Sequence, residues 1–441
     1  MLSQWISKSG VQSPESLSSN PSRKNPKWRT AILGITLFGN ALPMSTLAVS
    51  DPDDHVNFSA SLYYQYDDNL FRLPDLSSQE LNVILGESDT SDSLLISRAG
   101  INVNTTFSLQ TLQLNAQVSR YDYNRFDYLN FTGLDYDLLW DWRFTPDIMG
   151  TLSMKREDLP TTYDDYRDVT TANQRKLINR QFTLDGIISG GWSIIGRITQ
   201  SERENSGQFV AEDSFNQAGL EGGIKYTFRS GSNIRGLINR SKGDYTDREA
   251  DSVFLLDNQY DQQEAKIKAQ LDLTAKSLIT TEIGYRERVH PQFSERDYDG
   301  TFGSVQYQWL PTGKITINTS LLRELEAYQD IFSNYTVRDT FVITPIYQAT
   351  EKLSLQFQYT VSNRDFEGTP FNFGSDPSAP AELADRPQRQ DQSSKLSFSA
   401  NWRLSHSFDL SLSLDESHRN STEDLNDYDT YTVLFGINLQ I

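Results

Sequence analysis

Few side chains in this sequence are of a type that carries out covalent chemistry. The chain has no cysteine and only four histidines, His55, His290, His406 and His418. Ser417 precedes His418, but neighbours on a β-strand point to opposite faces, so these two do not form a nucleophile–base pair. The lack of cysteine excludes thiol catalysis, cysteine-ligated zinc, disulfide bonds and a lipoprotein anchor. We therefore expect no enzymatic activity and no cofactor.

Basic residues are the main group that could bind a solute. They lie in segments where polar and apolar residues alternate, in the same register as Glu221, Glu264 and Glu282. The set consists of Arg197, Lys225, Arg229, Arg235, Lys266, Lys268, Arg286 and Arg288. If the apolar register faces lipid, these side chains line the other face, where a positive arc could hold anionic sugars. The alternative is that the basic and acidic side chains neutralise one another across neighbouring strands.

Acidic side chains also cluster, in segments with the composition of loops. Asp67 and Asp68, Asp164 and Asp165, and Asp427 with Asp429 are oxygen ligands of the kind that Ca²⁺ accepts. Acidic side chains in loops are more often only solvated, so we assign no metal site.

The elements that must position these residues are β-strands. After residue 51, apolar and polar residues alternate, most clearly over 134–144, 218–228 and 431–441. A strand of this kind has one apolar and one polar face. The pattern predicts strands near 54–66, 98–109, 112–123, 133–144, 148–157, 175–188, 191–202, 214–229, 233–243, 259–273, 278–289, 299–309, 314–325, 335–347, 353–364, 394–404, 408–417 and 429–441. About eighteen strands, with sixteen as the alternative, predict an all-β fold, a transmembrane antiparallel up-and-down barrel.

The connections support this interpretation because short and long links alternate. Short links with turn chemistry lie near 110–111, 145–147, 189–190, 230–232, 274–277, 310–313, 349–352 and 405–407. Long polar loops span 67–97, 158–174, 244–258 and 365–393. Outer-membrane barrels have short periplasmic turns and long external loops. No helix is expected in these loops.

The N-terminal residues and the bulk composition point to an exported protein. Residues 1–50 resemble a signal peptide with an extended basic first part, an apolar stretch over 30–42 and a small-residue cleavage pattern at 48–50. An uncleaved N-terminal anchor is the alternative. The barrel would then occupy residues 51–441. The net charge of −19 argues against a nucleic-acid partner, which needs a basic footprint.

One short motif goes beyond general barrel features. Residues 64–75 read Tyr-Gln-Tyr-Asp-Asp-Asn-Leu-Phe-Arg-Leu-Pro-Asp and follow the first predicted strand. This motif resembles the first-strand signature of EpsL-type outer-membrane β-barrel proteins of exopolysaccharide operons, within a broader group of barrel porins. Asp67, Asp68 and Asn69 can tighten the turn where the strand leaves the membrane. Phe71 is expected to anchor at the membrane interface, and Arg72 completes the motif.

The resemblance implies a part in exopolysaccharide biosynthesis, export or surface attachment, as a passive channel or docking protein. It implies a Gram-negative outer-membrane location, contact with lipid and lipopolysaccharide, and a polysaccharide ligand. Periplasmic and inner-membrane polysaccharide assembly proteins would be the protein partners. Two alternatives stay open: a general or sugar-selective diffusion porin, and a closed barrel that scaffolds a secretion complex.

Overall fold

The chain is described here by a computed structural model that covers residues 55–160, 162–164, 169, 172–206, 214–330, 332–370 and 387–441. The predicted signal peptide, residues 1–50, lies outside the described residues, as do Asp165 and the start of the predicted barrel at 51–54. None of the helices in the described segments is long and apolar enough to cross a membrane.

Eighteen strands make up almost all of the regular structure. Their bounds are β1 Val56–Asp67, β2 Asp92–Phe107, β3 Gln110–Tyr123, β4 Phe131–Thr145, β5 Ile148–Pro160, β6 Gln174–Ser189, β7 Trp192–Glu204, β8 Phe215–Thr227, β9 Asn233–Tyr245, β10 Gln259–Thr274, β11 Ser277–Val289, β12 Tyr298–Thr312, β13 Ile315–Ala327, β14 Tyr335–Gln348, β15 Leu353–Glu367, β16 Gln390–Arg403, β17 Phe408–Ser421 and β18 Tyr428–Gln440. One α-helix, α2 Ser78–Leu85, and the 3-10 turns Asp127–Leu129, Ser294–Arg296 and Asp424–Asn426 lie in the connections.

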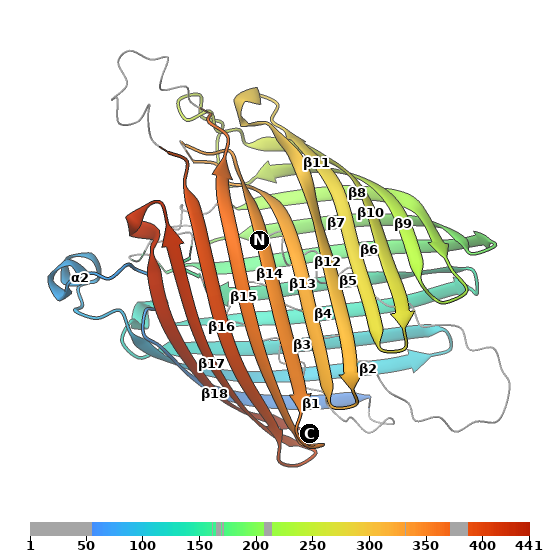
Figure 1. Ribbon diagram of the computed structural model, residues 1–441, viewed down its shortest axis with the longest axis horizontal. Helices are drawn as coiled ribbons and strands as arrows, with labels where there is room; N and C mark the ends of the chain where they lie inside the picture. The colour runs from blue at the N-terminus through green and yellow to red at the C-terminus, as the bar shows by residue number, and fades with distance from the viewer. Residues whose placement is uncertain are drawn as a thin grey trace. The chain divides into compact units, whose positions relative to one another are not determined.

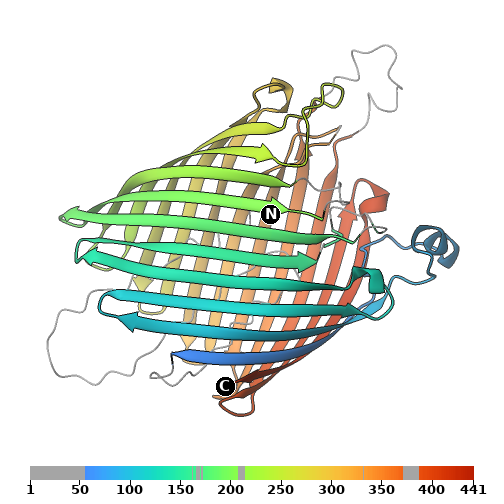
Figure 2. The ribbon, with the colours of Figure 1, turned by 180° about the vertical axis from the view of Figure 1, so that it is seen from behind.

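The strands form one closed ring. Each strand pairs antiparallel with the next, and β18 pairs with β1 from Ser59–Gln440 to Asp67–Thr432. Figures 1 and 2 show the strands side by side around both faces of this ring. The prediction of an eighteen-stranded antiparallel up-and-down barrel is therefore confirmed.

Three strands depart most from the predicted bounds, two because they begin earlier and one because it ends later. β2 starts at Asp92 rather than residue 98, β16 starts at Gln390 rather than 394, and β17 runs to Ser421 rather than 417. These extensions all lie at the long-loop end. The added residues of β16 and β17 are polar on both faces, whereas those of β2 include Leu94, Leu95 and Ile96 and are apolar on both faces, so in each case the alternation that marks a strand is lost.

The expectation that the loops hold no helix was wrong. Helix α2 lies in the loop between β1 and β2, and Figure 1 shows it standing away from the strands. Ser77 and Glu80 form a reciprocal capping box at its start, and Gly86 ends it in the left-handed conformation at φ 73°. Local capping residues specify this short helix. A sequence pattern of long apolar periodicity, by which longer helices are recognised, does not detect it.

The outward register of the ring is the apolar one. Ile238, Leu220 and Ile283 leave 71%, 65% and 64% of their surfaces exposed. Exposed aromatic side chains flank this belt: Trp140, Trp192, Trp309, Tyr347 and Trp402 toward the short turns, and Tyr64, Tyr66, Tyr285 and Tyr431 toward the long loops. A closed ring with an apolar belt between two aromatic girdles is the surface of a barrel in the outer membrane.

Candidate functional site

The strand register directs the predicted basic residues to the inner face of the ring, with one exception. Arg197 lies beside Glu221 and Lys268 beside Glu282, on the face opposite Ile198 and Ile267. Arg229 is the exception, because β8 ends at Thr227 and Arg229 is exposed in the following short turn. The prediction that β8 reaches 229 is corrected on this point, since the turn chemistry of Ser230 and Gly231 takes effect sooner.

A chain of ion pairs crosses the middle of this inner wall. Glu221 of β8 lies 3.3 Å from Arg197 Nη1 and 2.7 Å from Lys266 Nζ. Lys266 is also 3.4 Å from Glu264, and Glu264 is 2.8 Å from Arg286 Nε. These five side chains alternate in sign from β7 to β11, so each charge has an opposite neighbour.

The remaining basic residues of the arc also have polar partners. Lys268 Nζ lies 2.6 Å from Glu282, and Lys225 forms an ion pair with Asp185. Arg235 Nε donates to Asn233 Oδ1 at 3.0 Å. The inner wall is thus a mosaic of paired charges and not a uniformly positive surface. Contact of these basic side chains with a solute stays a prediction.

Arg288 is held by aromatic side chains that the sequence search did not include. Its guanidinium lies 3.8 Å from the ring centre of Tyr260 and 5.6 Å from that of Tyr298. Its Nε and Nη2 donate to Gln262 Oε1 at 3.0 and 2.6 Å. Such stacking between a guanidinium and ring faces is attractive because the ring face is negative. Tyr260 and Tyr298 share the inward register of Arg288, which is the signal that could have identified them.

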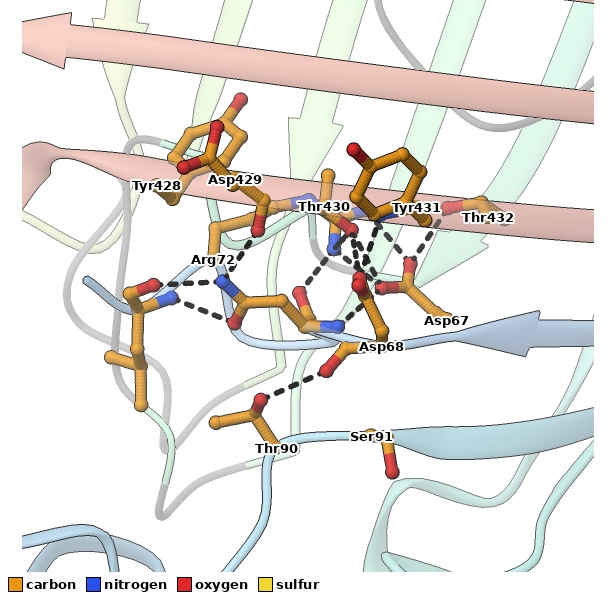
Figure 3. Close-up of polar contacts among 12 residues, drawn as sticks. Asp67, Asp68, Arg72, Thr90, Ser91, Tyr428, Asp429, Thr430, Tyr431 and Thr432 are labelled. Carbon is orange, nitrogen blue, oxygen red and sulfur yellow. Dashed lines mark hydrogen bonds and ion pairs between the residues drawn. The ribbon is translucent and has the colours of Figure 1, made fainter. Parts of the chain in front are cut away.

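The geometry of the first turn is centred on the seam where the ring closes. Arg72 Nη1 and Nη2 donate to Asp67 Oδ1 and Oδ2, both at 2.9 Å. Thr430 and Thr432 of β18 donate to the same carboxylate at 3.0 and 3.2 Å. Figure 3 shows Asp67 between Arg72 and the two threonines. Asp67 therefore joins the first strand, the first loop and the last strand.

Asp68 and Asn69 make further contacts across the same seam. Asp68 Oδ1 accepts from the backbone N–H of Tyr431 at 2.7 Å and from Thr430 Oγ1 at 3.1 Å (Figure 3). Asn69 Nδ2 donates to the carbonyl oxygens of Leu73 at 2.7 Å and Asp429 at 2.9 Å. These contacts satisfy backbone groups at the point where the strand ladder ends. The side chains of this turn reach β18 as well as their own turn.

Phe71 does not anchor at the membrane interface, contrary to the prediction. Its side chain is fully buried, and its ring packs edge-on against Phe126 at 4.7 Å and Tyr163 at 4.8 Å between centres. These partners come from the β3–β4 and β5–β6 loops. The backbone of Arg72 has a φ of 55°, which turns the chain so that Phe71 points into this loop cluster while Arg72 points to the seam.

A second polar cluster lies in the loops above β10 to β14. Arg296 is fully buried and donates to the carbonyl oxygens of Phe254, Leu255, Asp330 and Ser333 at 2.6–3.2 Å. It therefore fastens the β11–β12 loop to the loops on either side. Burial away from water lowers the pKa of Arg296 to about 10.

His290 lies at the base of this loop cluster. Its ring Nδ1 is 3.3 Å from Asp297 Oδ1, and its Nε2 is 2.8 Å from Gln329 Nε2. Gln329 Oε1 in turn accepts from Arg248 Nη1 at 2.8 Å. Since the Gln329 amide nitrogen is a donor, His290 must accept at Nε2 and is neutral. Burial, and then the positive charge of Arg288, lower the pKa of His290 to about 3.

Comparisons with known proteins add little at the level of sequence. No protein-family model matches the chain, and no curated protein matches it. Among solved structures, the outer membrane protein OpdK from Pseudomonas aeruginosa matches with a TM-score of 0.44 and 9% identity over 88% of this chain and 99% of that one. A BenF-like porin from Pseudomonas fluorescens Pf-5 matches with a TM-score of 0.47 and 11% identity over 88% and 98% of the chains. OccAB3 from Acinetobacter baumannii gives 0.44 and 9% over 88% and 99%. Because these identities and TM-scores are low, the fold assignment rests on the strand pairing of this chain and not on the comparisons.

Proposed function

We propose that this protein is a passive diffusion channel of the outer membrane. The observation that carries the proposal is the closed ring of eighteen strands with an apolar outer and a polar inner register. Barrels of about sixteen to eighteen strands are wide enough to leave an aqueous lumen. A lumen lined by polar side chains gives polar solutes a path across the membrane, which the lipid itself does not.

The chemistry of the inner wall favours hydrated polar solutes. The alternating charges from Arg197 to Arg286 attract neither sign strongly, because each has an opposite partner within 3.4 Å. Amide side chains share the wall, such as Gln308, whose amide donates to Asn318 at 3.3 Å. Amides and paired charges can exchange hydrogen bonds with hydroxyl groups, so sugars and other polyols suit this wall.

A role in exopolysaccharide export or attachment remains the finer alternative. It rests on the motif at residues 64–75, which resembles the EpsL type. The contacts of Asp67, Asp68 and Asn69 across the β1–β18 seam give this motif a structural role that needs no polymer. Deletion of the gene separates the two functions. If the protein exports or attaches polysaccharide, the amount of secreted or surface-bound polysaccharide should fall in the deletion strain. A diffusion channel predicts unchanged polymer and slower uptake of small polar solutes.

The channel itself is tested by solute permeation. Protein extracted from outer membranes is placed in liposomes, and swelling is followed with sugars of increasing size. We expect fast swelling with monosaccharides and slower swelling as the sugar grows. Swelling rates equal to those of protein-free liposomes, from a barrel that resists heat unfolding in detergent, would contradict the proposal and favour the closed scaffold.

A further inference from the structure

The short turns at one end of the ring repeat a single device. Thr274 Oγ1 accepts from the backbone N–H of Lys276 at 3.1 Å, and Thr312 Oγ1 accepts from that of Lys314 at 3.2 Å. Thr350 Oγ1 accepts from Lys352 N–H at 3.1 Å. Each hydroxyl thus tightens the turn that leads into the next strand. In each case the lysine is the residue just before that strand.

Each of these lysines also reaches toward the neighbouring turn. Lys276 Nζ lies 3.4 Å from Pro311 O, Lys314 Nζ 3.4 Å from Ala349 O, and Lys352 Nζ 3.2 Å from Leu404 O. A carbonyl oxygen leaves the ammonium charge uncompensated. Among the described residues, no carboxylate lies within ion-pair distance of these ammonium groups, in contrast to the paired lysines of the wall.

The turn geometry does not require a lysine. In the β4–β5 turn, Thr145 Oγ1 accepts from the backbone N–H groups of Asp147 at 3.3 Å and Ile148 at 3.0 Å. Thr312 makes the equivalent bonds to Lys314 and Ile315 at 3.2 and 3.1 Å. The same turn therefore forms with an aspartate at the lysine position. Folding of the turn does not explain the positive charge.

The positive charges gather on one side of the rim. The β8–β9, β10–β11, β12–β13 and β14–β15 turns follow one another around the ring and carry Arg229, Lys276, Lys314 and Lys352, with Glu351 as the one acidic residue in these turns. We name these residues the basic turn row. All are exposed, and the three lysines continue the inward register of the strand that they join. Hairpins lie about 10 Å apart around a sheet, so the row extends over about 30 Å.

The opposite rim has the opposite charge. The long loops carry many more Asp and Glu than Lys and Arg residues, as in Asp75, Glu80, Glu87 and Asp89 of the first loop. Short turns of outer-membrane barrels face the periplasm. In a chain of net charge −19, the basic turn row is thus a local positive surface at the periplasmic mouth.

We propose that the basic turn row captures a linear polyanion, a chain of regularly spaced carboxylates or similar groups, at the periplasmic mouth. One unpaired cation on each hairpin fits a multivalent ligand better than a single small anion, because only an extended chain can contact the whole row. The acidic long loops would repel the same ligand at the other mouth. This inference rests on the proposed channel, and it adds the class of ligand and the side from which that ligand is captured.

The experiment uses protein extracted from outer membranes and inserted into planar bilayers in about 0.1 M salt, where charges act over roughly 10 Å. The probe is polygalacturonate, a linear polyuronate, and neutral dextran of similar length is the control. Orientation is set by S252C, labelled with biotin and blocked by streptavidin on the long-loop side, because the chain has no other cysteine. Capture is counted as blocking events per second from each side.

We expect capture of polygalacturonate from the short-turn side to exceed capture from the loop side by about tenfold. The variant K276Q/K314Q/K352Q should remove this excess, and replacement of the same residues by arginine should retain it. D147N changes the charge of a matched turn outside the row and should not lower capture. Equal capture from both sides, or an excess that survives the glutamine variant, would overturn the proposal.

Binding separates this inference from the channel itself. Fluorescently labelled polygalacturonate is titrated onto the detergent-solubilised protein, a readout that needs no open pore. Salt-sensitive binding lost in the glutamine variant supports the polyanion site even if no conductance is found. If that variant instead loses affinity only for phosphatidylglycerol vesicles, the row contacts lipid headgroups and the polyanion proposal is wrong.

Discussion

Asp67, the last residue of β1, and Arg72, five residues later, form a buried bidentate ion pair with both N–O distances at 2.9 Å. Because Thr430 and Thr432 bind the same carboxylate, this pair also holds β18. Among the eighteen strands that the structure describes, the closing seam is the only place where the ring joins strands far apart in sequence. The pair therefore stabilises the contact that turns a sheet into a barrel.

The first prediction concerns this ion pair. D67N removes the charge and leaves the Arg72 guanidinium buried without its partner, which costs about 3–5 kcal/mol in comparable pairs. We expect the free energy of unfolding, measured with urea in lipid vesicles, to fall by that amount. The control is D122N, which breaks the exposed Arg120–Asp122 pair at 2.7 Å and should cost less than about 1 kcal/mol. Equal losses in the two variants would contradict the role given to the seam.

A second prediction concerns Phe71 and how firmly it holds the loops packed around it. F71A removes a fully buried ring from between Phe126 and Tyr163, at a cost of about 3–5 kcal/mol in local stability. Trypsin cleavage after Arg125, in the neighbouring β3–β4 loop, should accelerate by about 100-fold or more, since 1.4 kcal/mol is a factor of ten. V83A changes a side chain that is 87% exposed on α2 and should leave the rate unchanged. An unchanged rate in F71A would show that the aromatic cluster does not hold these loops.

Removal of one wall carboxylate should change ion selectivity. E221Q leaves Arg197 and Lys266 without their shared partner and makes the wall more positive. We expect the chloride-to-potassium permeability ratio to rise about two- to fivefold, from roughly 0.5–1 kcal/mol of added attraction. The reversal potential in a KCl gradient measures this ratio. E287Q is the matched control, because Glu287 is exposed on the outward face of β11. A larger shift in E287Q than in E221Q would refute the assigned faces.

His290 makes the loop cluster sensitive to acid. Its pKa is about 3 in the folded protein and about 6.5 when exposed, so the folded state holds fewer protons. The stability that the neutral ring contributes is complete above pH 6.5 and is lost as the pH falls toward 3. The protection factors of the β11–β12 loop in hydrogen exchange, which correct for the pH dependence of the intrinsic exchange rate, should therefore fall as the pH drops from 6.5 toward 3. This loss of protection at low pH should be absent in H290Q. It should persist in H406Q, which changes a histidine in an exposed short turn. Identical pH profiles in the wild type and H290Q would rule out this residue.

The strand count could be predicted because lipid imposes a strict pattern. Within the membrane, every second residue must be apolar, as at Leu220, Ile224 and Ile238, so the alternation marks each strand. The same logic fails beyond the lipid. β2 begins at Asp92, and its first residues include Leu94, Leu95 and Ile96, which are apolar on both faces, so no alternation remains there.

The candidate sites could be predicted only in part. Alternation correctly places Lys266 and Glu221 on one face, but their 2.7 Å contact spans the strand between them and depends on register and side-chain reach. The motif at Asp67 predicts a local turn, whereas its partner Thr430 lies at the far end of the chain. Ring closure brings the two together, and no local sequence signal encodes that pairing.

Single-channel conductance of the protein extracted from outer membranes is the most direct test of the proposed channel. The wall of paired charges predicts stable, long-lived conductance steps with weak ion selectivity, reduced when sugars occupy the lumen. An absence of steps from a barrel that is shown to be folded by its resistance to heat would contradict a diffusion channel.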